Sequence, residues 1–223
     1  MISKLPRWAW YGSAGLAAGA GMINAVGFLS FQHQGVTHLT GSTTLLGMAV
    51  ATGRWADAGH LLAVAGSFLG GCILSGVIVQ DSTLKLGRHY GVALMGESLL
   101  LLCAIPFLRR GDAMGAYLAS CACGLQNGMV STYSGAVLRT THVSGAFTDL
   151  GILLGHRLRR IAVDTRRIRL CLLLIGAFLF GSAAGALGYA RFEYGTLYFP
   201  AGLTGAVGIV YGLYRPRGTI VAR

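Results

Sequence analysis

Charged residues are scarce in this chain, and their scarcity excludes an ordinary soluble domain. Only 11% of the 223 residues are Asp, Glu, Lys or Arg, whereas a soluble globular domain carries about a quarter. Hydrophobic residues make up 54% of the sequence, and its mean hydropathy is +0.62. This composition predicts an all-α integral membrane protein, because helices satisfy their own backbone hydrogen bonds in lipid.

The sequence also lacks the patterns that metal sites and common hydrolases require. It contains no His-Glu-x-x-His and no Gly-x-Ser-x-Gly motif, and its five cysteines all lie within apolar runs. Cys121-Ala122-Cys123 does not have the spacing of zinc ligands. We therefore expect no metal, no cofactor and no enzymatic activity.

Acidic residues are the scarcest charged group, with 7 Asp and Glu against 18 Lys and Arg and a formal net charge of +11. The basic residues cluster in short gaps between apolar runs, which is typical of cytoplasmic loops of membrane proteins. We therefore expect membrane lipids as partners, and no nucleic acid. The largest cluster is predicted to anchor the topology and contact anionic headgroups. Its members are Arg157, Arg159, Arg160, Arg166, Arg167 and Arg169.

A duplicated pattern of polar residues is present in this predominantly apolar sequence. Each copy places a Thr-His-x-Thr/Ser-Gly motif after a long apolar segment that contains a buried amide. The pattern predicts one integral membrane domain made of two homologous repeats, residues 1–110 and 111–223. The matching stretches are 37–41 with 141–145, 44–47 with 148–151, and 66–69 with 176–179.

Six segments reach the length of about 20 mostly apolar residues that a spanning helix needs. Two further apolar segments, 40–53 and 144–156, are shorter, and each begins with the duplicated Thr/Ser-Gly. The first long segment resembles a secretory signal, but it continues into Asn24, so we interpret it as a retained span. The six long segments are 9–31, 58–80, 90–108, 114–136, 168–190 and 196–214.

The two short segments leave two topologies open. If they cross the membrane there are eight spanning helices, and if they dip in and return there are six spans and two re-entrant half-helices. The positive-inside rule puts both termini and the loop 157–169 in the cytoplasm in either case. A helix of about 14 residues rises about 21 Å, short of a hydrocarbon core of about 30 Å. We therefore favour six spans.

In the six-span topology the half-helices start near the bilayer centre, at Thr40-Gly41 and Ser144-Gly145. Their free amide groups and positive dipole ends would point inward, and Thr40 and Ser144 are predicted N-caps. Transporters use such helix starts to hold anionic or polar solutes. The alternative is that each motif only caps and packs a short helix.

Several polar residues accompany the two helix starts. The histidines precede the predicted caps by two residues and are candidates for a gate or a proton carrier. The buried amides either bind solute or tie helices together, at about 1 kcal/mol each. The predicted solute-binding residues are Asn24, His38, Thr40, Gly41, Thr44, Gln126, Asn127, His142, Ser144, Gly145 and Thr148.

Two carboxylates are predicted inside the membrane, where they are costly and therefore functional candidates. Glu97 lies in the middle of a long apolar segment, and Asp149 lies in the second short one, opposite Leu45 of the first repeat. Both are candidates for proton coupling. A structural, hydrogen-bonded acid is the alternative for Glu97, and solvation near a cytoplasmic vestibule is the alternative for Asp149.

Five stretches together resemble a bacterial family. They are 24–28 (NAVGF), 37–41 (THLTG), 124–128 (GLQNG), 139–145 (RTTHVSG) and 148–151 (TDLG). Over nearly its whole length the chain resembles the YoaK-like family of bacterial inner-membrane proteins, the domain of unknown function numbered 1275. The resemblance implies a multi-pass protein with about six spans, and it implies no activity. Ser144 stands where threonine is more usual, which keeps the hydroxyl.

The sequence thus predicts a small-solute transporter or channel of the bacterial inner membrane. An anionic or polar solute would bind between the two repeats, with coupling to protons as one option. A non-transporting scaffold or anionic-lipid-binding protein is the alternative. A six-span chain of this size has a thin core, which favours a homodimer without specifying one.

Overall fold

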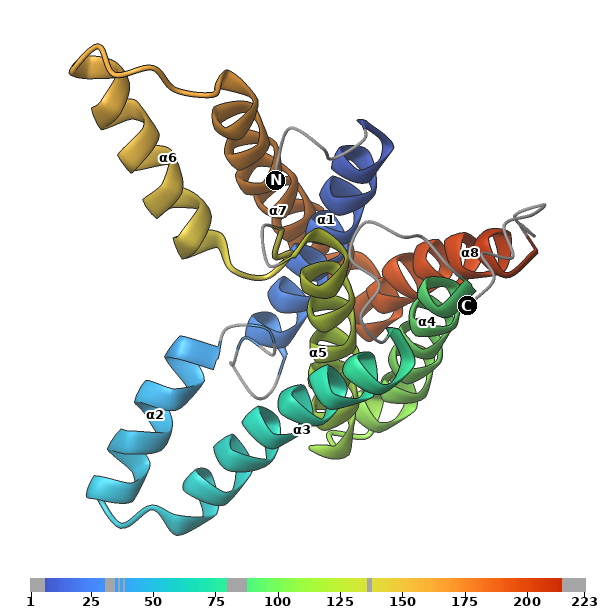
Figure 1. The fold of residues 1–223 in the computed structure, drawn as a ribbon. Coiled ribbons are helices and arrows are strands. Elements are labelled where there is room, and N and C mark those ends of the chain that lie inside the picture. Colours follow the sequence, from blue (N-terminus) through green and yellow to red (C-terminus); the bar gives the residue numbers. More distant parts are fainter. Residues whose placement is uncertain are drawn as a thin grey trace.

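The computed structural model describes residues 7–30, 35, 37, 39–79, 88–135 and 138–213, and this part of the chain is helical without any strand. The arrangement is shown in Figure 1. The elements are α1 (Arg7–Leu29), α2 (Leu39–Ala51), α3 (Trp55–Val79), α4 (Arg88–Arg109), α5 (Met114–Ser134), α6 (Val143–Leu158), α7 (Thr165–Phe192), the 3-10 helix η2 (Glu193–Leu197) and α8 (Tyr198–Leu213).

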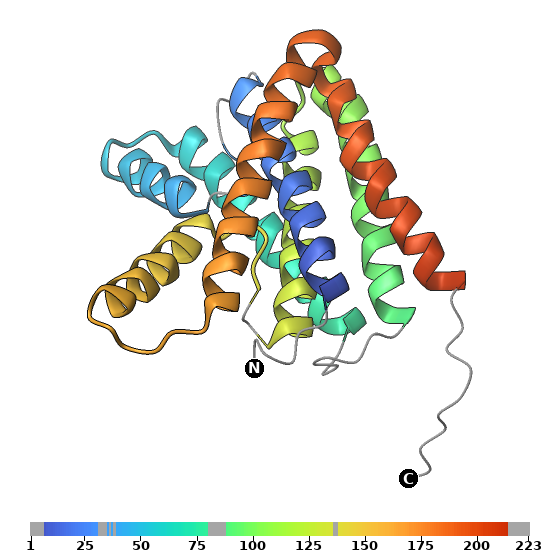
Figure 2. The same ribbon diagram turned by 90° about the horizontal axis from the view of Figure 1, so that it is seen from above.

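Local chemistry explains where several helices begin and end. α5 ends at Gly135, whose φ of 61° lies in the left-handed region that glycine adopts at little cost. α7 begins after Asp164, whose carboxylate accepts a hydrogen bond from the backbone N–H of Arg166 at 2.9 Å. α7 ends at Phe192, because the next residue, Glu193, has a φ of 50° that breaks the helix, and η2 then turns the chain into α8. Figure 2 shows α7 and α8 as the two arms of a hairpin.

Four stretches of the described chain are helical, long and apolar enough to cross a membrane: Trp8–Leu29, Trp55–Val79, His89–Arg109 and Thr165–Leu213. The last comprises α7, η2 and α8. α5 has 21 residues but is less apolar, because its buried surface includes hydroxyl and amide side chains. Each of the six long segments predicted from the sequence thus contains a helix.

The outer surface of the bundle is apolar. Large hydrophobic side chains are exposed along α3 and α7, including Leu69 at 60%, Val77 at 69%, Phe180 at 71% and Leu187 at 76%. Monomeric soluble proteins rarely expose so much contiguous apolar surface to water. The exposed faces therefore suit acyl chains, and the chain is a helical, membrane-like protein.

Two pairs of helices in the bundle approach each other through glycine. α1 packs against α7 and α3 packs against α5. A Cβ atom at Gly21 or Gly181 would overlap the backbone of the facing helix in the first pair, and one at Gly71 or Gly124 would do so in the second. Small residues allow this close packing of helix backbones in membranes. α4 joins the bundle by packing against α5 and α8.

α2 and α6 are attached differently. Among the described elements, α2 packs only against α3, and α6 only against α7. Figures 1 and 2 show both short helices projecting from the same side of the bundle, with their first residues nearest to it. They begin at Leu39 and Val143, one residue earlier than the sequence predicted.

Candidate functional site

The first turns of α2 and α6 open onto a shared cavity of about 690 Å³, which we call the central cavity. Residues from α1, α3, α5 and α7 complete its wall. Five pairs of residues at matching places in the two halves of the sequence line it. They are Asn24 with Asn127, Thr37 with Thr141, Leu39 with Val143, Thr40 with Ser144, and Phe68 with Phe178.

The capping prediction for the two short helices is wrong. The N-cap of α6 is His142, with φ −98° and ψ 63°, and its side chain makes no capping hydrogen bond. Thr40 and Ser144 instead lie in the first turns of α2 and α6. Their carbonyl oxygens accept hydrogen bonds from the hydroxyls of Thr44 and Thr148, each at 3.0 Å. These matching bonds occupy the Thr44 and Thr148 hydroxyls within their own helices.

The two amides on the cavity wall differ in their partners. Asn24 is 9% exposed, and its Oδ1 accepts hydrogen bonds from the Thr37 hydroxyl at 2.8 Å and the Thr37 backbone N–H at 3.4 Å. It thereby ties the chain before α2 to α1. The Oδ1 of Asn127 is buried and has no hydrogen-bond partner among the described residues. Since an unpartnered buried oxygen is costly, Asn127 is the amide available to a bound solute.

Gln126 does not line the central cavity. Its side chain is 1% exposed, and its Nε2 donates a hydrogen bond to the backbone oxygen of Leu16 at 2.8 Å. The bond joins α5 to α1. Successive helix residues point about 100° apart, so Gln126 and Asn127 face different neighbours. The structure therefore places Gln126 as a tie between helices.

His142 immediately precedes the first residue of α6, and its imidazole lies beside Gly145. A Cβ atom at Gly145 would overlap the His142 imidazole, so a side chain at this position would require the ring to move. Its predicted counterpart, His38, lies outside the described residues. Gly41 is half-buried near the start of α2 and is not on the cavity wall.

Arg139 is the one side chain with a formal charge among the described residues that line the central cavity. Arg139 is not among the site residues predicted from the sequence, although it opens the polar stretch that leads into α6. A single cation on the wall, together with two helix N-termini, makes the cavity electropositive.

The residues on this wall also carry the resemblance to a family. The family described as "Protein of unknown function (DUF1275)" matches residues 13–210. The chain belongs to the DUF1275 family. None of the curated proteins and none of the solved structures compared with this DUF1275 protein matches it. Family membership supports a membrane-like helical protein and assigns no activity.

The acidic candidates of this DUF1275 protein lie away from the central cavity. Glu97, on α4, is 1% exposed, and its Oε2 has no hydrogen-bond partner among the described residues. Asp149 lines a second cavity of about 590 Å³ between α6 and α7, where Gly145 and Thr148 also lie. The second cavity shares Arg139, His142 and Ser144 with the central one.

The predicted headgroup arginines lie at the α6–α7 connection and on the adjoining helix ends. All six are exposed, and none forms an ion pair within the described part of the chain. Arg167 also lines the second cavity. The members are Arg157, Arg159, Arg160, Arg166, Arg167 and Arg169.

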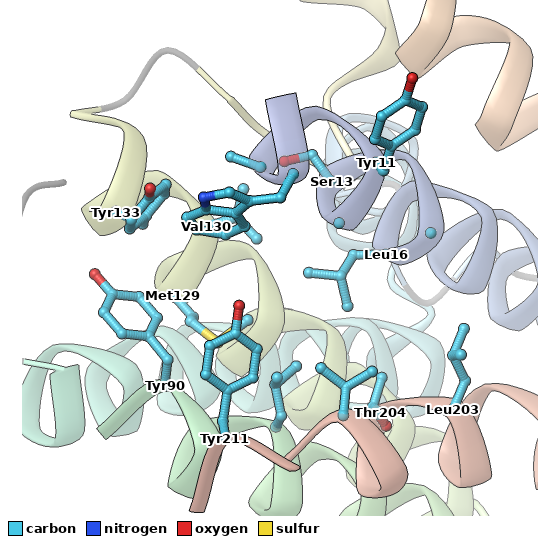
Figure 3. A pocket seen from close by; sticks show the side chains of 16 residues that line it. Tyr11, Ser13, Leu16, Tyr90, Met129, Val130, Tyr133, Leu203, Thr204 and Tyr211 are labelled. Atoms are coloured by element: carbon cyan, nitrogen blue, oxygen red, sulfur yellow. The ribbon is translucent and has the colours of Figure 1, made fainter. Parts of the chain in front are cut away.

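A third cavity, of about 240 Å³, lies between α1, α4, α5 and α8 and is apolar. Figure 3 shows its aromatic lining, including Tyr90, Tyr133 and Tyr211. The rings of Tyr90 and Tyr133 meet edge to face, with centroids 5.6 Å apart. Among the described residues, its lining contains no charged side chain and no predicted solute-binding residue.

Proposed function

We propose that this DUF1275 protein is a transporter or channel for a small anionic or polar solute in the bacterial inner membrane. The observation that carries the proposal is the central cavity, lined by matching residues from both halves of the chain. A cavity that served only packing would be filled by apolar side chains. This one instead presents hydroxyls, two amides and Arg139.

The proposal includes two repeats, residues 1–110 and 111–223. In support, exchanging the helices of the halves turns the α1–α7 contact into the α5–α3 contact and leaves the α4–α8 contact unchanged. The close-approach glycines correspond in the same way, Gly21 with Gly124 and Gly181 with Gly71. α2 and α6 pack in the same manner, each against the helix that follows it.

We place six spans in the membrane and treat α2 and α6 as half-helices. α2 has 13 residues and α6 has 16. The rise of α2, about 20 Å, falls short of a hydrocarbon core of about 30 Å. Like α2, α6 packs against a single neighbour among the described elements, whereas α8, also of 16 residues, packs into the bundle against α4. Starts that line a cavity between helices fit helices that begin within the bilayer, where irregular backbone is tolerated if it lines a cavity. Both termini and the arginine-rich α6–α7 connection would then be cytoplasmic.

The chemistry of the cavity favours an anion over a neutral solute. The first N–H groups of a helix have no partner within the helix, so the starts of α2 and α6 can donate hydrogen bonds to an anion. Arg139 adds a full positive charge. The free Oδ1 of Asn127 would accept a hydrogen bond from a solute hydroxyl or protonated oxygen. A small hydroxylated or partly protonated anion satisfies all three.

The test is a screen for stabilisation followed by flux. The purified protein would be heated with a panel of inorganic and small organic anions at constant ionic strength, since a ligand that binds the folded state raises its melting temperature. The stabilising anion would then be loaded into proteoliposomes for uptake measurements. Binding without flux would disprove transport, and the lack of any stabilising solute would disprove the site.

A second candidate function is a non-transporting scaffold that binds anionic lipids, and six exposed arginines without an ion pair in the described part of the chain favour it. Liposome flotation would compare the wild type with a variant carrying all six Arg→Gln changes. Headgroup binding that disappears in the variant, together with zero solute flux in the wild type, would favour the scaffold.

A further inference from the structure

The two halves differ at the place where each short helix meets the next long one. The second cavity, of about 590 Å³, lies between α6 and α7, and we call it the vestibule from here on. The vestibule adjoins the central cavity, because Arg139, His142 and Ser144 line both. A solute that passed from the vestibule to the central cavity would meet these three side chains.

The corresponding place between α2 and α3 is closed by apolar packing. Ala49, Ala58 and Leu61 are at most 6% exposed and form one cluster, with Leu46 packed against it. These residues hold the second half of α2 against the first two turns of α3. The counterpart of Leu61 in the second half is Cys171, which lines the vestibule.

The charges of the two places differ as well. The vestibule is lined by Arg139, Arg167 and Asp149. The first half has Leu45 where the second has Asp149, and Asp57 where the second has Arg167. Asp57 is held in an ion pair with Arg54, at 3.3 Å.

Two arginines against one carboxylate give the vestibule a net positive charge. A cleft lined by one sign of charge concentrates the opposite ion and speeds its entry. The arginine-rich α6–α7 connection lies at the far end of the same two helices, so its field has the same sign.

We propose that the vestibule between α6 and α7 is the path by which an anion reaches the central cavity from the cytoplasm, with the matching α2–α3 side closed. The proposal rests on the proposed function and deepens it, because it assigns the side of access and the charge of the solute. Arg167 attracts the anion, Arg139 receives it, and His142 stands between the two compartments.

A matched pair of cysteine variants tests the path without knowledge of the solute. Thr148 lines the vestibule, and Thr44 is its counterpart on α2, where it lines neither cavity. Both are exposed, and both hydroxyls make the same bond within their own helix. Thr148→Cys and Thr44→Cys are therefore equally conservative changes. Each would be made in a chain whose five natural cysteines are replaced by alanine.

Inside-out membrane vesicles would be treated with membrane-impermeant thiol reagents, one with a sulfonate and one with a quaternary ammonium group. We expect Thr148→Cys to react from the cytoplasmic side and Thr44→Cys to remain unreacted. The sulfonate reagent should react with Thr148→Cys faster than it reacts with a free thiol in solution. Adding Arg167→Gln should lower the sulfonate-to-ammonium rate ratio about tenfold. Arg166→Gln, an exposed neighbour that does not line the vestibule, should leave the ratio unchanged.

The path is refuted if Thr148→Cys reacts only in right-side-out vesicles, or if both cysteines react alike from the cytoplasm. If Arg167→Gln leaves the sulfonate-to-ammonium rate ratio unchanged, the selection of anions by charge is refuted. These failures are separate from failure of the proposed function. If Thr148→Cys is not labelled but an anion still raises the melting temperature, the access path is refuted and the central site is supported. If labelling is as expected but no anion raises the melting temperature, the access path is supported and the central site is refuted.

Discussion

Arg139→Gln should weaken anion binding in the central cavity and leave the fold intact. Its guanidinium is the one formal charge on the described wall of a cavity of about 690 Å³. A sphere of that volume has a radius of about 5.5 Å, so an anion at its centre and this charge interact by about 0.8 kcal/mol in water and about 3 kcal/mol at an effective dielectric of 20. Because Arg139 is exposed, the lower half of that range applies.

The expected loss of affinity is therefore about fivefold to thirtyfold, from about 1 to 2 kcal/mol. At an anion concentration 100 times the wild-type dissociation constant, binding stabilises the folded state by about 2.7 kcal/mol. A tenfold weaker site leaves about 1.4 kcal/mol at that concentration, so the anion-induced rise in melting temperature should fall by about half. The assay is thermal unfolding in detergent at constant ionic strength.

Two further variants sharpen this experiment. Arg139→Lys keeps the charge but loses the forked donor geometry, so it should fall between the wild type and Arg139→Gln. Arg110→Gln removes an exposed arginine that lines none of the described cavities, and it should behave as the wild type does. Equal stabilisation of the wild type and Arg139→Gln by the same anion would refute the electrostatic role of this residue.

Three other results are expected. Gly124→Ala would push a methyl group into the backbone of α3 and should destabilise the protein by about 1–3 kcal/mol, whereas Gly70→Ala, with open space around it, should be neutral in thermal unfolding. Arg54→Cys and Arg159→Cys should be labelled from opposite sides of the membrane if α2 is a half-helix; labelling from the same side would establish eight spans. Glu97→Gln should keep the fold and abolish the pH dependence of solute uptake in proteoliposomes, and unchanged coupling would remove the proton role of Glu97.

The duplicated motif predicted the central cavity better than it predicted the ends of the helices. Asn24, Asn127, Thr40 and Ser144 meet at one cavity, as equivalent places in two halves would. The capping prediction failed because a side-chain cap contributes only about 1 kcal/mol. The packing of α6 against α7 is large enough to override such a preference and to let the helix begin at Val143.

Other features depended on tertiary structure that a single sequence does not encode locally. Two adjacent amides, Gln126 and Asn127, are equivalent candidates until the rotation of α5 about its axis is known. Phe178 reaches the central cavity because α7 packs against α1, far away in the chain. Spacing along the chain carries no information on that encounter.

The glycine contacts have a mechanical consequence. Because α1 is fastened to α7 and α3 to α5, the halves of the chain are interlocked, and pulling them apart would break both glycine contacts at once. α2 and α6 are each fastened to a single neighbour. In an alternating-access cycle, α2 and α6 would therefore move as rigid helices relative to the bundle, while α1, α3, α5 and α7 would keep their positions.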